Sequence, residues 1–205
     1  MSHERSDGIP SMLLGRTVFA LVGVLWGMRS LQAFAEPNFT DPESVSDWWA
    51  VVSFSLCWAL LPAGLALLVR LTQRGGRAPY VLLVIAALGA VTAAIANVIE
   101  DGMGVDAAGS VYFVSVSLMM LTMIALAGVL LAGRPRWPGL VVLSTLIGML
   151  NLEAGGGVLV LVVWGATAIA CDHQRPRDAR TRVPRRARPF ASHKALLCAA
   201  HDCPD

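Results

Sequence analysis

Three polar residues near the end of one apolar stretch are the first candidates for chemistry in this sequence. Asn97, Glu100 and Asp101 are three or four positions apart, so on a helix they share one patch of surface. Carboxylates placed in this way can act as a general acid or base, or can bind a hard cation such as calcium. The ordered spacing of a known calcium loop is absent. The bland interpretation is that Asn97 bonds across helices and the acids mark a helix end.

A positively charged residue inside another apolar stretch is the second candidate. Arg29 lies about one to two turns from the end of its block. Because burying a charge in lipid costs free energy, an ionisable group inside a span is a candidate functional residue. Arg29 either binds an anionic group in an outward-facing polar pocket, or it pairs structurally with one of the nearby acids, or it extends to the interface. The predicted outer polar cluster comprises Arg29, Asn97, Glu100, Asp101, Asn151 and Glu153.

The C-terminal end carries four side chains that zinc can bind: His193, Cys198, His201 and Cys203. Their spacing matches no standard zinc finger, in which two pairs of ligands are separated by a longer loop. All the histidines lie outside the apolar blocks, and there is no CxxC pair or glycine-rich phosphate loop. The sequence therefore predicts no metal site and no cofactor.

The elements that carry these residues are predicted to be membrane-spanning helices. The 205 residues are 56% hydrophobic and only 15% charged, whereas an average soluble domain is about 25% charged. The apolar residues come in blocks, and about 20 such residues are enough to cross a bilayer. We predict an all-α polytopic bundle with six spans, at about 13–35, 48–70, 79–99, 110–131, 137–151 and 155–171.

The last two of these spans come from a single block, residues 137–171. As one straight helix the block would run roughly 50 Å, against a hydrocarbon core of about 30 Å. Its middle, residues 151–157, reads Asn-Leu-Glu-Ala-Gly-Gly-Gly and so combines a carboxylate with three residues that are poor in a helix interior. We therefore predict a tight turn there, between two short helices that form a hairpin.

The basic residues predict how the spans are oriented. Lysine and arginine in short loops favour the cytoplasmic side, and six spans place every basic residue except Arg29 on that side. Residues 1–12 are then a cytoplasmic N-terminus and residues 172–205 a basic, disordered cytoplasmic tail. An alternative is that residues 1–35 are a cleaved signal peptide. Arginines of the tail are expected to contact anionic headgroups: Arg175, Arg177, Arg180, Arg182, Arg185, Arg186 and Arg188.

Small residues at four-residue spacing predict where helices approach closely. The 79–99 span carries several of them, and we expect this span to be central in the bundle. A GxxxG pair in the first span is either an internal packing face or a dimer seam, and the internal face is favoured. The predicted packing residues are Gly23, Gly27, Ala86, Gly89, Ala90, Ala93 and Ala94.

These patterns favour a structural, accessory or regulatory component of a plasma membrane, and the alanine, glycine and arginine richness is typical of a bacterial source. Its expected partners are the bilayer and either another membrane protein or a second copy of the chain. Nucleic acid is not expected, because no base-reading fold accompanies the basic tail. The alternatives are a small transporter or channel with its entrance at the outer polar cluster, and an enzyme acting on lipid or an envelope precursor.

Overall fold

Every element that the structure describes is a helix, as predicted. The structure is a computed structural model that describes residues 8–35, 42, 44–72 and 76–173. Within these residues the elements are α1 (Gly8–Ala35), α2 (Val45–Leu71), α3 (Ala78–Asn97), η1 (Val98–Gly102), α4 (Ala107–Leu131), α5 (Trp137–Leu150), η2 (Leu152–Ala154) and α6 (Gly156–His173).

Four of the described helices are long and apolar enough to cross a membrane. They are Leu13–Phe34, Val45–Leu71, Ala78–Gly102 and Ala107–Leu131, and they agree with the predicted class of helical membrane protein. The apolar helices Trp137–Leu150 and Gly156–Cys171 are shorter. With 14 residues, α5 is about 21 Å long, which is less than the roughly 30 Å of a hydrocarbon core.

The predicted break in the last apolar block is present between α5 and α6. Gly155 turns the chain with a φ of 87°, in the left-handed region that glycine adopts without strain. Gly156 follows it directly against the carbonyl oxygens of Gly148 and Asn151, where a Cβ atom would overlap both. The glycine run therefore supplies both the turn and the close approach of the two helices.

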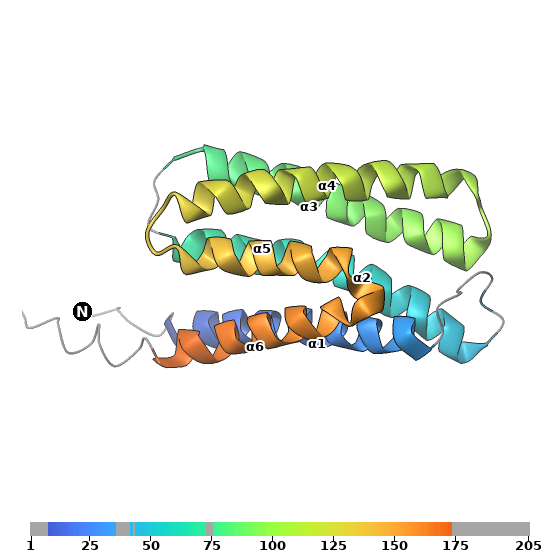
Figure 1. Cartoon of the computed structure of the whole chain (residues 1–205), viewed down its shortest axis with the longest axis horizontal. Coiled ribbons are helices and arrows are strands. Elements are labelled where there is room, and N and C mark those ends of the chain that lie inside the picture. Colours follow the sequence, from blue (N-terminus) through green and yellow to red (C-terminus); the bar gives the residue numbers. More distant parts are fainter. Residues whose placement is uncertain (1–7, 36–41, 43, 73–75, 174–205) are drawn as a thin grey trace, which may run out of the picture. The chain divides into compact units, whose positions relative to one another are not determined.

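The tip of this hairpin is fastened to α1. The Ser30 hydroxyl donates a hydrogen bond to the carbonyl oxygen of Leu152 at 2.9 Å, and Gly157 lies against the backbone of Trp26. Ser30 precedes the last residue of α1, Ala35, by five positions, so the tip lies about 7 Å short of that end. Figure 1 shows the hairpin turning back before the ends of α2, α3 and α4.

Consecutive helices run in opposite directions, so charges of one sign gather at each end (Figure 1). One end carries the connections from α2 to α3 and from α4 to α5. We call it the arginine end, after Arg16, Arg70, Arg77, Arg134 and Arg136. The other end carries the connection from α3 to α4. We call it the acidic end, after Asp47, Glu100, Asp101 and Asp106.

Helix α2 is the central helix among those described. It packs against α1, α3 and α5. Of its most apolar 18-residue stretch, 50% is buried, against 39% of the corresponding stretches of α1, α3 and α4. The prediction that the 79–99 span is central is therefore wrong. The small residues of α3, such as Gly89 beside Met119 of α4, occupy one side of the helix. Large side chains, including Val84, Leu88 and Ile95, are exposed on the other.

Trp164 of α6 joins four helices in the core. Its side chain is fully buried, and its indole N–H donates a hydrogen bond to the Thr145 hydroxyl of α5 at 2.8 Å. The ring lies 5.6 Å from that of Phe19 in α1, measured between centroids. On α2 the ring is so close to Gly64 that a Cβ atom there would overlap Trp164 Cζ3.

The predicted packing residues all lie at helix contacts or in the core. Gly23 and Gly27 face α6, where their Cβ atoms would lie 3.2 and 3.0 Å from atoms of Leu161. The four alanines of the set are buried residues of α3: Ala86, Ala90, Ala93 and Ala94. The GxxxG pair thus forms an internal face between α1 and α6.

Candidate functional site

Helix α3 ends in a π-helical turn that carries both predicted carboxylates. Over Val98–Gly102 the helix widens into η1, which contains Glu100 and Asp101. Past the turn, the Val105 amide donates to the carbonyl of Ile99 at 3.2 Å, six residues back. Such π-helical turns are rare in proteins, and many of those known lie at functional sites. The sequence analysis did not predict this turn. The turn distinguishes the acidic end from the other helix ends of the bundle.

Two contacts hold the π-turn against α2 and α4. A Cβ atom on Gly102 would lie 3.0 Å from Trp48 Cζ3 of α2. On the other side, the Glu100 carboxylate lies directly against Gly109, where a Cβ atom would overlap it. Gly109 is in the first turn of α4, and the positive end of a helix dipole stabilises a carboxylate there. Glycine at these two positions leaves room for the carboxylate and for the Trp48 ring.

Asn97, one turn before the acids, links α3 to α2. Its side chain is 2% exposed, and its Nδ2 donates to Ser55 Oγ at 3.1 Å and to the carbonyl of Val51 at 3.4 Å. A buried amide with two partners is a stabilising cross-link between apolar helices. Asn97 therefore fixes the end of α3, from which the π-turn continues, against α2. Its side chain is too buried to contact a ligand.

Arg29 of α1 is the cation of the site. Its guanidinium carbon lies 4.6 Å from the centroid of the Phe54 ring in α2, within the range of a cation–π interaction. Its charge also interacts with that of Asp101 on the π-turn. Arg29 on α1 and Asp101 on η1 thus lie at the same end of the bundle.

Four aromatic rings from three helices pack together beside this cation, and Phe54 is the ring that it contacts. They form an aromatic cluster of Trp26, Phe54, Trp58 and Tyr112, with neighbouring centroids 5.1 to 6.4 Å apart. Edge-to-face geometry, as between Trp26 and Trp58 at 88°, stabilises such pairs beyond their burial. Among the described residues, the buried Trp26 Nε1 has no hydrogen-bond acceptor. The cluster was not predicted, since tryptophan in an apolar block reads as one more apolar residue.

Two members of the predicted cluster are not part of this site. Asn151 is exposed, and its amide donates to the carbonyl of Ile147 in its own helix at 2.8 Å. Glu153 is exposed at the hairpin tip. The hairpin turns before the acidic end, and this short reach is why its polar residues do not join Glu100 and Asp101.

The described part of the chain offers no metal centre. Within it, no three histidine, cysteine or acidic side chains are placed to hold a metal ion. The weak zinc candidates, His193, Cys198, His201 and Cys203, and the tail arginines Arg175–Arg188 lie outside the described residues.

Comparison with protein-family models, with curated proteins and with solved structures finds no match to this chain. The chemistry of the site therefore has to be inferred from its own residues. What those residues provide is a half-buried cation over an aromatic ring, two carboxylates at the same end of the bundle, and a π-turn that contacts α2 and α4.

Proposed function

We propose that the chain is a multi-pass protein of the bacterial plasma membrane with both termini in the cytoplasm, acting as a structural or accessory component of a membrane assembly. The four long apolar helices support the membrane location. The arginine end supports the sidedness, because basic residues in short loops favour the cytoplasm. The α5–α6 hairpin supplies the fifth and sixth segments and returns the chain to the same side.

One observation carries the proposal for a structural role: polar side chains within the spans bind other parts of the bundle. Asn97 binds α2, and Trp164 binds Thr145 of α5. Ser53 of α2 donates to Gln32 of α1 at 3.2 Å. A transport path requires polar groups that face a solute, whereas these groups fasten one helix to the next.

Photo-crosslinking in the native membrane tests this role. A photoreactive residue is placed at outward-facing positions on three helices: Leu31, Leu88 and Phe113, which are 65%, 64% and 72% exposed. An accessory component should give a discrete adduct from one face and little from the others. The same labelled chain, purified to homogeneity, is the control. If none of the three positions gives an adduct in the native membrane, and the purified chain is a monomer, the proposal is contradicted.

A second proposal, a small transporter or channel, is favoured by the π-turn and by the opposite charges of Arg29 and Asp101 near the acidic end. In it, Arg29 and Asp101 form a polar entrance. Proteoliposomes loaded with chloride, potassium or a pH dye would report flux. In this case Arg29→Gln and Asp101→Asn should each abolish it, while the exposed control Gly128→Ala should not. Unaltered flux in both variants, or no flux of any of these ions, would exclude this entrance.

A further inference from the structure

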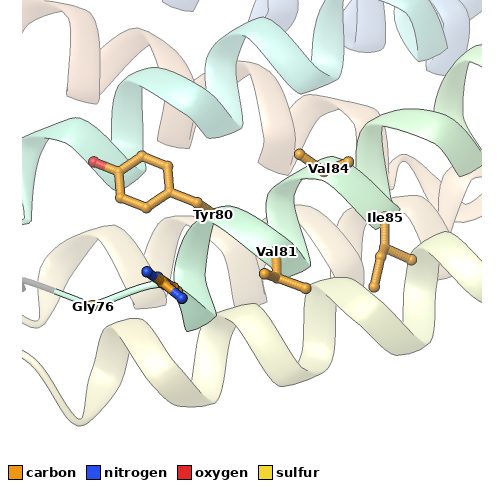
Figure 2. A pocket seen from close by; sticks show the side chains of 6 residues that line it. Gly76, Tyr80, Val81, Val84 and Ile85 are labelled. Carbon is orange, nitrogen blue, oxygen red and sulfur yellow. The ribbon is translucent and has the colours of Figure 1, made fainter.

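A groove runs along the outer face of α3 near the arginine end. It has a volume of about 550 Å³ and is lined by Gly76, Arg77, Tyr80, Val81, Val84 and Ile85. Figure 2 shows the side chains of Tyr80, Val81, Val84 and Ile85 extending from one stretch of this helix. The volume is in the range of small-molecule sites, which is about 300–1,000 Å³.

We propose that this groove binds one anionic phospholipid of the surrounding bilayer. The lipid phosphate is held by Arg77 and Tyr80, and an acyl chain lies along Val81, Val84 and Ile85. This inference rests on the proposed membrane location, and it names the ligand of a site separate from the aromatic cluster and the π-turn.

The headgroup end of the groove is suited to a phosphate. Arg77 is exposed, and it makes no ion pair with any carboxylate that the structure describes. It is the N-cap residue of α3, whose first turn has no side-chain cap. Uncapped amides and a guanidinium together favour an anion. Tyr80 is 50% exposed, and its phenol is typical of residues at headgroup depth.

The other end of the groove is suited to an acyl chain. Val81 and Ile85 are one turn apart on α3, and Val84 lies between them along the helix. Val81 and Val84 are more than half exposed, and Leu88 continues this apolar surface by another turn. A hydrocarbon chain that starts at Arg77 and runs along the helix axis would therefore contact only apolar side chains.

A lipid fits this surface better than a second helix does. Close helix pairing in a membrane uses small residues that let backbones approach. The outward row of α3 is instead made of Tyr80, Val81, Val84 and Leu88, while the small residues of this helix face into the bundle. The pairing of a cation with an apolar wall is complementary to an anionic phospholipid.

The test reconstitutes the full chain in nanodiscs that contain equal amounts of phosphatidylcholine and phosphatidylglycerol. Native mass spectrometry then identifies the lipid that remains bound after release. The wild type should retain phosphatidylglycerol preferentially. Arg77→Gln should lower that preference about fivefold, which corresponds to about 1 kcal/mol, because it removes the group that holds the lipid phosphate directly. Arg136→Gln removes an exposed charge at the same end and should leave the preference unchanged.

A second pair of variants tests the acyl end. Val84→Trp fills the groove and should reduce retention of both lipids, whereas Leu121→Trp, at an exposed position of α4 outside the groove, should not. Equal retention of the two lipids by the wild type, or equal behaviour of the Arg77 and Arg136 variants, would overturn the proposed site. Resistance of every variant to carbonate extraction reports membrane insertion separately. Its loss in the wild type would count against the proposed function.

Discussion

Replacing Gly64 with alanine would place a methyl group inside the volume of the Trp164 ring. The new Cβ atom would overlap Cζ3 of that ring and lie 2.6 Å from Cη2, whereas carbon atoms pack at about 3.5–4.0 Å. The ring must therefore move by more than about 1 Å. It has little freedom to do so, because Thr145 accepts its N–H on one side and Phe19 packs against it on another.

Overpacking of this kind typically costs 1–3 kcal/mol. Alanine also improves helix propensity over glycine by about 1 kcal/mol, and this gain partly hides the cost. Gly128→Ala is the matched control, since nothing lies within 4 Å of a Cβ atom there. The difference in free energy of unfolding between the Gly64 and Gly128 variants then isolates the overlap, and we expect it to be about 1–3 kcal/mol.

Unfolding in mixed micelles with increasing SDS, followed by far-UV circular dichroism, measures this difference without relying on tryptophan fluorescence. In the double variant with Trp164→Leu, the Gly64→Ala penalty should largely disappear, because the atoms it collides with are gone. If Gly64→Ala is as stable as Gly128→Ala, then α6 does not pack on α2 as described.

Three further changes test other parts of the structure. Asn97→Ala removes the amide that joins α3 to α2 and should cost about 0.6–1.7 kcal/mol of unfolding free energy in the same assay; no cost would contradict a buried cross-link. Thr145→Val leaves the buried indole N–H of Trp164 without an acceptor and should cost about 1–3 kcal/mol, while Thr145→Ser should be close to wild type. For sidedness, Asp106→Cys should react with an impermeant maleimide on intact cells and Arg134→Cys only after permeabilisation, and the reverse pattern would refute the orientation.

The helical segments and the hairpin break could be predicted because both depend on local sequence. Apolar run length decides whether a helix can cross lipid, and the glycines of residues 155–157 decide where the last block must turn. The polar character of Asn97 also identified it as a link between helices. Each of these signals is strong because lipid tolerates few polar or helix-breaking residues.

The order of packing could not be predicted in the same way. Lipid tails and a protein core are equally apolar, so hydropathy does not separate the buried face of a helix from the lipid-facing one. For this reason the small residues of α3 wrongly indicated a central helix, and Trp164 gave no sign of its role as the contact among four helices. The π-turn escaped prediction because widening one turn at Val98–Gly102 leaves no mark in composition.

The hairpin of α5 and α6 begins and ends at the same end of the bundle. Removing it would leave the sidedness of the remaining helices unaltered, since α1 to α4 already return to their starting side. A chain truncated after Arg134 should therefore display its new C-terminus to the same compartment as the full-length protein. On the proposed topology, the hairpin can therefore insert after the other four helices are already in place.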